Sequence, residues 1–140
     1  MNQSSVAVGH RFPQRQFTVS PSRVEEYVIA LGVAPEEGWR AEPGMPVPPG
    51  FLMYVSTYGA EALHEAIGLD FRRGVYGGMD VEYLESVRVG DTVTVAPVIS
   101  GTSTKQGKGG PLTFVELTCE YVLPDGRVAV RERSTTVQTG

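Results

Sequence analysis

The sequence predicts a single α+β domain in which a strongly curved antiparallel sheet wraps around one long buried helix. Two observations lead to this prediction. The segment Phe51–Ile67 is apolar on nearly all sides, which is typical of a helix surrounded by other structure. After Phe71, alternating apolar residues separated by turn signals indicate long strands only. Helices followed by a run of strands favour an antiparallel sheet.

The N-terminal part is predicted to hold a flexible arm, a short strand and one amphipathic helix. The arm covers residues 1–13, and the domain proper covers residues 14–140, beginning with a strand at Gln14–Val19. Ser20 can cap the free N–H groups of a helix, and Pro21 suits its first position because the missing N–H costs nothing there. The predicted buried face of this helix recurs at i, i+3, i+4 and i+7, with Val24, Tyr27, Val28 and Leu31.

A long loop precedes the predicted central helix. Residues 33–50 contain five prolines and three glycines, so regular structure is improbable there. A loop of this length inside a small domain is usually functional or mobile. Small residues within Phe51–Ile67 would let a sheet approach the helix closely, and we therefore expect this helix to lie at the centre of the domain.

The C-terminal half is predicted to form four strands, which are Met79–Val89, Thr92–Thr104, Leu112–Leu123 and Arg127–Gln138. The turns between the last three are a glycine-rich stretch at Lys105–Gly110 and the strong signal Pro124-Asp125-Gly126. An outer strand of such a sheet presents unpaired N–H and C=O groups, which pairing with a second copy would cover. Dimerisation is therefore expected.

Composition and charge argue against several classes of protein. The 140-residue chain has a net charge of −4 and no long basic run, so we expect no nucleic acid partner. Its one cysteine, Cys119, excludes an internal disulfide and a multi-cysteine zinc site, and we expect neither a metal nor a cofactor. No apolar stretch has the length of a membrane span, and no signal peptide is indicated. The expected location is cytoplasmic.

Several short stretches resemble the MaoC-like hydratase/dehydratase family. Residues 77–92, GGMDVEYLESVRVGDT, resemble the family's second strand, which leads into a Pro-x-Arg-x-Gly-Asp bend. Arg88, Gly90 and Asp91 match this bend, and Ser86 replaces its proline.

Other stretches extend the resemblance over roughly residues 14–138. KQGKGG at 105–110 followed by LTFV at 112–115 resembles the family's turn and fourth strand, and DGRVA at 125–129 followed by ERST at 132–135 resembles its last hairpin. Pro48-Pro49-Gly50-Phe51 is similar to the Pro-Pro-Thr-Phe of dehydratase modules in fatty-acid-synthase-like systems. The resemblance implies a hot-dog fold.

The resemblance also implies binding of acyl thioesters of coenzyme A or acyl carrier protein. The typical reaction of the family is the reversible loss of water from a 3-hydroxyacyl thioester. This reaction needs a base for the proton beside the carbonyl, an acid for the departing hydroxyl, and N–H donors for the thioester oxygen. Gly50 would let that oxygen approach the N–H groups of Phe51 and Leu52 at the start of the central helix, where free donors and the dipole favour negative charge. The alternative is that Pro48-Pro49-Gly50 merely starts a helix.

The usual acid and base are missing from the loop. Members of the family carry Gly-Asp-x-Asn-Pro-x-His before the central helix, whereas residues 33–50 contain neither aspartate nor histidine. Tyr76, Asp80, Glu82 and His64 are the candidate replacements. The alternatives are that Asp80 and Glu82 share a solvent-facing surface and that His64 is a buried, hydrogen-bonded histidine.

Four further residues are candidates for substrate binding. Tyr54 either faces the pocket or belongs to the core or a dimer interface. Trp39 either covers an acyl pocket or attaches the loop to the core. Lys105 and Lys108 either meet the phosphates of coenzyme A or the acidic surface of a carrier protein, or they form a solvated hairpin tip.

Three functions are therefore considered. The expected one is a (3R)-hydroxyacyl-thioester dehydratase or enoyl hydratase-like protein. The second is a non-catalytic acyl-binding subunit, paired with another hot-dog subunit that carries the Asp/His motif. The third is a hot-dog pocket repurposed for cyclisation or isomerisation in natural-product biosynthesis, where preorganised binding supplies most of the rate.

Overall fold

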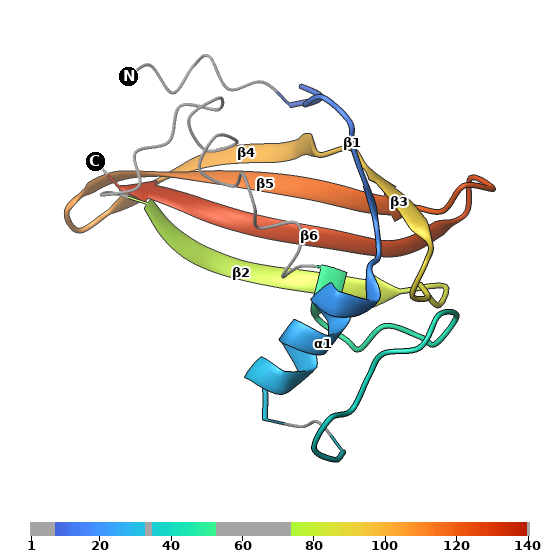
Figure 1. The fold of residues 1–140 in the computed structure, drawn as a ribbon. Helices are drawn as coiled ribbons and strands as arrows, with labels where there is room; N and C mark the ends of the chain where they lie inside the picture. Colours follow the sequence, from blue (N-terminus) through green and yellow to red (C-terminus); the bar gives the residue numbers. More distant parts are fainter. Residues whose placement is uncertain (1–7, 33–34, 53–73, 140) are drawn as a thin grey trace.

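The computed structural model describes residues 8–32, 35–52 and 74–139. Figure 1 shows a strongly curved sheet with helix α1 (Pro21–Ala30) outside it. The sheet order is β1-β3-β5-β6-β2, all neighbours are antiparallel, and β4 pairs with β5 as well. The predicted curved antiparallel sheet is confirmed. The strands are β1 (Arg15–Thr18), β2 (Gly74–Tyr83), β3 (Thr92–Val95), β4 (Val98–Gly107), β5 (Gly110–Val122) and β6 (Val128–Thr139).

The long hairpin of β5 and β6 forms the middle of the sheet. It pairs from Leu112 opposite Thr139 down to its turn. The predicted turn at Pro124-Asp125-Gly126 is confirmed, because the Gly126 N–H donates to the Leu123 carbonyl at 2.9 Å. Gly126 has a φ of 88°, a conformation that glycine adopts at little cost.

The strand predicted at Thr92–Thr104 is interrupted at Pro97. A proline has no N–H to donate to a ladder, so β3 stops before it and β4 starts after it. Both strands pair with β5, at Thr94 opposite Val122 and at Val98 opposite Thr118. β3 and β4 therefore pair with successive parts of the same strand, β5.

The arm predicted over residues 1–13 is attached to the sheet in its described part. The Gly9 N–H donates to the Ile99 carbonyl at 2.8 Å, and the Phe12 N–H donates to the Pro97 carbonyl at 3.0 Å. Phe12 is buried in a small second core cluster together with Ile99, Val115 and Leu117. These bonds and this burial attach the chain to the sheet from Gly9 onward.

The strand predicted at Met79–Val89 is shifted toward the N-terminus, since β2 covers Gly74–Tyr83. The regular ladder with β6 ends at Tyr83, which lies opposite Val130. The N–H groups of Leu84 and Glu85 both donate to the Ala129 carbonyl, at 2.8 and 3.0 Å, so two successive residues use one acceptor.

A bulge at Gly77 interrupts the register between β2 and β6. Tyr76 lies opposite Thr136, whereas Gly78 lies opposite Thr135. A Cβ at Gly77 would lie 3.2 Å from the Thr135 carbonyl oxygen, and Gly78 has a φ of 151°. Both positions of the bulge therefore favour glycine.

Helix α1 begins and ends as predicted. At its start, the Ser20 hydroxyl accepts a hydrogen bond from the Arg23 N–H at 3.3 Å. At its end, Gly32 has a φ of 72°. The buried face is narrower than predicted, because Tyr27 is half-buried and Leu31 is exposed. The fully buried residues of the helix are Val24 and Val28.

The main core cluster joins α1, the loop and the sheet. Phe51 and Leu52 are helical and buried, and they begin the predicted helix Phe51–Ile67, the rest of which lies outside the described residues. No helix in the described ranges is long and apolar enough to cross a membrane. The buried members of the cluster are Val19, Val24, Val28, Ala41, Phe51, Leu52, Val87, Val89, Val93, Val95, Tyr121, Leu123, Ala129 and Val130.

We predict that Gly78→Ala lowers the free energy of unfolding by about 1–2 kcal/mol, because a side chain at this positive φ is strained. Gly109→Ala is the matched control, since a Cβ there would meet nothing within 4 Å. Urea unfolding of the two variants measures the difference. Equal stability of both variants would contradict a glycine requirement at the bulge.

Candidate functional site

A cleft of about 440 Å³ lies between the end of the proline-rich loop and the end of β2. This volume lies within the range of small-molecule sites. Its lining combines apolar side chains with a phenol, a carboxylate and a hydroxyl, which makes it the best candidate site in the described part of the chain. The lining residues are Pro46, Val47, Pro48, Pro49, Gly50, Leu52, Tyr83, Leu84, Glu85, Ser86, Val87 and Val130.

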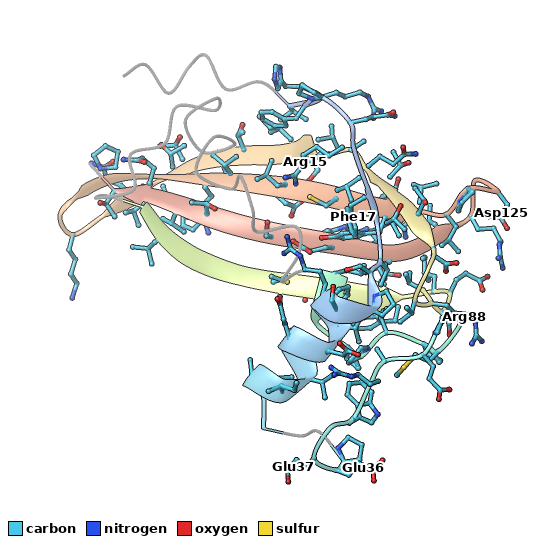
Figure 2. The ribbon with its side chains drawn as sticks, in the orientation of Figure 1. Arg15, Phe17, Glu36, Glu37, Arg88 and Asp125 are labelled. Carbon is cyan, nitrogen blue, oxygen red and sulfur yellow. The ribbon has the colours of Figure 1, made fainter. Side chains whose placement is uncertain are left out.

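The bend at Arg88 holds the loop side of the cleft. The Arg88 guanidinium donates to the Gly44 carbonyl at 3.0 Å, and the Asp91 carboxylate accepts from the Arg88 N–H at 2.8 Å. Backbone hydrogen bonds also pair residues 44–47 with residues 87–89. Figure 2 shows Arg88 at the end of the sheet beside the loop. The matching residues of the family's bend therefore attach the loop to the sheet.

Helix α1 holds the same loop from the other side. The Glu25 carboxylate accepts from the Ala41 N–H at 3.0 Å and lies 3.8 Å from the Arg40 guanidinium. Trp39 is half-buried and packs against the main core cluster, and it does not line the cleft. Of the two interpretations of Trp39, attachment of the loop to the core therefore agrees with the structure.

The turn before the central helix contacts Tyr27. The Tyr27 hydroxyl donates to the Pro49 carbonyl at 3.0 Å, and its ring meets the Phe51 ring edge to face with centroids 5.7 Å apart. Gly50 has a φ of 86°, and a Cβ there would lie 2.5 Å from the Tyr27 hydroxyl oxygen. Both the backbone conformation and the available space favour glycine.

One of the two N–H donors predicted at this turn is already used within the turn. The sequence predicts Phe51 and Leu52, but the Phe51 N–H donates to the Pro48 carbonyl at 3.3 Å and its ring is buried in the core. Gly50 and Leu52 line the cleft. The Gly50 N–H has no hydrogen-bond partner among the described residues. Gly50 therefore adds an N–H donor at this turn beside Leu52, which was predicted as a donor and also lines the cleft.

Polar groups on the other side of the cleft come from the turn after β2. The Glu85 carboxylate lies 3.3 Å from the Arg127 guanidinium, which also pairs with Asp125 at 2.6 Å. Hydrogen bonds from the backbone N–H and the side chain of Arg127 lower the pKa of Asp125. Tyr83 is 57% exposed beside Glu85. A carboxylate and a phenol are thus available at the cleft.

The predicted carboxylates of β2 lie on the outer face of the sheet. Asp80 is exposed and lies opposite Arg133 in register. Glu82 is 3.8 Å from Arg131, whereas the intervening Val81 packs against the core. The structure therefore does not bring Asp80 to the cleft, in agreement with the interpretation of a solvent-facing surface.

The two predicted lysines lie far from the cleft. Lys105 belongs to β4 and places its ammonium 5.3 Å from the centre of the Phe114 ring, and Lys108 occupies the two-residue turn that follows. The turn is shorter than the predicted Lys105–Gly110, because β4 continues to Gly107 and β5 begins at Gly110. The β4–β5 turn lies at the end of the sheet that contains the start of β2 and the end of β6. The cleft lies at the opposite end, where β2 ends.

Three of the other predicted site residues lie wholly or partly outside the described part of the chain. Tyr54 and His64 lie outside the described residues, and of Tyr76 only the backbone, paired opposite Thr136, is described. Figure 2 shows Glu36 and Glu37 at the tip of the loop, away from the sheet. Within the described ranges, no group of three or more His, Cys, Asp or Glu side chains could hold a metal.

A buried carboxyl on β6 was missed by the sequence reasoning. Glu132 is 9% exposed and accepts a hydrogen bond from the Tyr121 hydroxyl at 2.9 Å. Burial raises the pKa of Glu132, and the hydrogen bond from Tyr121 opposes this effect. Cys119 lies opposite Glu132 in register, and burial together with the nearby Glu132 raises its pKa to about 12. The signal available in the sequence was strand alternation, because Glu132 is two residues after the apolar Val130 and therefore shares its face of β6.

The family model of the FAS1-like dehydratase domain region matches residues 6–132. No protein with a curated description matches the sequence. The match covers most of the chain, including the loop, the turn at Gly50 and the sheet up to Glu132.

Solved structures share the fold at low sequence identity. The C-terminally truncated HadBC (3R)-hydroxyacyl-ACP dehydratase complex from Mycobacterium tuberculosis has a TM-score of 0.69 and 16% identity, over 93% of this chain and 96% of that chain. The R-hydratase PhaJ1 from Pseudomonas aeruginosa has a TM-score of 0.60 and 10% identity, over 97% and 84%. A Staphylococcus aureus protein solved with CoA has a TM-score of 0.61 and 12% identity, over 93% and 70%. The predicted hot-dog fold is confirmed.

We predict that Glu132→Gln stabilises the protein at about pH 8 and has little effect near pH 4. The raised pKa means that the folded chain holds this proton more tightly than the unfolded chain, so stability falls as pH rises through the folded pKa. Glutamine removes the buried charge and can still accept from Tyr121. Melting temperatures of both proteins across this pH range measure the effect, and a difference that does not vary with pH would contradict it.

Proposed function

The chain belongs to the family of FAS1-like dehydratase domains, and on this basis we propose that it acts as a (3R)-hydroxyacyl-thioester dehydratase or enoyl hydratase on acyl thioesters of coenzyme A or acyl carrier protein. The observation that carries the proposal is the cleft, in which the turn at Gly50 faces the polar groups of residues 83–86. HadBC and PhaJ1, which share the fold, are described as a dehydratase and a hydratase.

An N–H donor and an apolar lining in the cleft support the proposal of thioester binding. The thioester oxygen would accept from the Gly50 N–H, which stabilises the negative charge that develops when the neighbouring carbon loses its proton. The acyl chain would contact the apolar lining at Leu52, Val87 and Val130. Burial of that chain contributes about 0.8 kcal/mol for each methylene.

Proton transfer is proposed for the polar groups of the cleft. Glu85 would take the proton from the carbon beside the carbonyl, and Tyr83 would donate a proton to the departing hydroxyl, so that water leaves and the enoyl thioester remains. Tyr76 and His64, which the sequence offers in place of the missing motif, remain proposed proton-transfer residues. Asp80 is not used, because it lies on the outer face of β2.

A second candidate function is a non-catalytic acyl-binding subunit. The specific observation in its favour is that the family's Asp/His motif is missing from residues 33–50 and that no carboxylate of this loop lines the cleft. HadBC is described as a complex. A partner hot-dog subunit would then supply the acid and base.

The outer edge of β2 is the proposed site of pairing with a second hot-dog subunit. Among the described residues β2 pairs with β6 alone, and its side chains Val75, Met79 and Tyr83 are 55%, 41% and 57% exposed. An exposed apolar edge strand is usually covered by another chain. We therefore expect Met79→Glu to weaken the dimer measured by sedimentation, whereas an unchanged dissociation constant would contradict this edge.

The direct test of catalysis is hydration of crotonyl-coenzyme A by the purified chain, followed by loss of the absorbance of the conjugated thioester. We predict turnover, and we predict that Glu85→Gln lowers kcat by about 100-fold, because a proton acceptor is lost. Glu82→Gln is the matched control, since Glu82 lies on the outer face of β2, three residues before Glu85, and should retain wild-type kcat.

Two results would decide against this assignment. Equal loss of activity in both variants would contradict a role of Glu85 in the cleft. Thioester binding without turnover, restored to activity by a subunit that carries the Asp/His motif, would favour the acyl-binding subunit.

A further inference from the structure

One side chain outside the cleft controls the peptide unit that carries the proposed N–H donor. The Pro49 carbonyl and the Gly50 N–H belong to the same peptide bond, and no cis peptide bond occurs in the described chain. In a trans peptide the C=O and N–H point in opposite directions. The Tyr27 hydroxyl donates to this carbonyl at 3.0 Å, so it fixes the direction of the Gly50 N–H away from Tyr27.

We propose that Tyr27 is a positioning residue of the thioester site, which orients and polarises the Pro49–Gly50 peptide so that its N–H can bind the thioester oxygen. This inference rests on the proposed function. A hydrogen bond accepted by a carbonyl also strengthens the N–H donor of the same peptide group, because such bonds polarise one another. Tyr27 would therefore act on both the direction and the strength of the donor.

The surroundings of Tyr27 hold it in the position that this role requires. Its ring packs edge to face on Phe51, the residue directly after Gly50. Its helix is anchored by the buried side chains of Val24 and Val28. Both contacts place the hydroxyl against the turn without the hydroxyl itself being needed for packing, so the ring and the hydroxyl can be tested separately.

Gly50 is complementary to Tyr27. A Cβ at position 50 would lie 2.5 Å from the hydroxyl oxygen and 3.7 Å from the ring carbon that bears it. The hydroxyl can approach the Pro49 carbonyl this closely only because residue 50 has no side chain. The pair therefore predicts a coupling between substitutions at the two positions.

The test is Tyr27→Phe, which keeps the ring on Phe51 and removes the hydroxyl. We expect kcat for crotonyl-coenzyme A hydration to fall roughly 10- to 100-fold with KM within about twofold, because a small misplacement of a catalytic donor has an effect of this size. We also expect the amide resonance of Gly50 to shift. Tyr121→Phe is the matched control, because it removes a tyrosine hydroxyl elsewhere in the domain, which donates to Glu132, and should leave kcat and the Gly50 amide unchanged.

The coupling is measured by melting temperatures. Gly50→Ala should destabilise the wild-type chain more than it destabilises the Tyr27→Phe variant, since the variant lacks the atom nearest the new Cβ. Equal destabilisation by Gly50→Ala in the wild type and in Tyr27→Phe would contradict the close contact between residue 50 and the Tyr27 hydroxyl.

Two further outcomes would overturn the positioning role. One is a Tyr27→Phe variant whose kcat and Gly50 amide resonance match the wild type. The other is an equal loss of kcat in Tyr121→Phe, which would assign the effect to general stability. Absence of turnover in the wild-type chain would instead contradict the proposed catalysis. The positioning role of Tyr27 would then be tested by the amide resonance of Gly50 alone. A shift in Tyr27→Phe but not in Tyr121→Phe supports the positioning role, and no shift overturns it.

Discussion

The position of the Pro49–Gly50 peptide is the constraint on which the candidate site depends. It is set from two sides, by the Tyr27 hydroxyl of α1 and by the backbone pairing of residues 44–47 with residues 87–89. Neither contact is local in sequence. The helix, the loop and the end of the sheet must therefore assemble together before the cleft exists, and the cleft is a product of the tertiary fold and not of any one motif.

Much of the fold could be predicted because its signals are local. The alternation of Val115, Leu117 and Tyr121 indicated a strand with one buried face, and these residues are buried. Ser20 was recognised as a cap because a cap acts within one turn of its helix. Gly50 was singled out from its place between two prolines and the predicted central helix, in a stretch that resembles the family's dehydratase modules, and its positive φ adds a physical reason for glycine.

The predictions failed where the structure is decided by contacts between residues that are distant in sequence. Val87 and Val89 continue the alternation of β2, but they pair with the loop, so periodicity could not show where β2 ends. Glu132 was missed because a carboxylate is rarely buried, and its acceptance of the Tyr121 hydrogen bond depends on the register between β5 and β6. The donor at Phe51 was predicted without knowledge that Pro48 would already accept its N–H.

The most direct measurement is a residue-by-residue map of amide chemical shifts during titration of the labelled chain with crotonyl-coenzyme A. We predict the largest changes at Gly50, Leu52, Glu85 and Ser86, which line the cleft, and small changes at Asp80 on the outer face of β2. Changes centred on the outer face of the sheet, or no changes at saturating thioester, would contradict the assignment of this cleft as the thioester site.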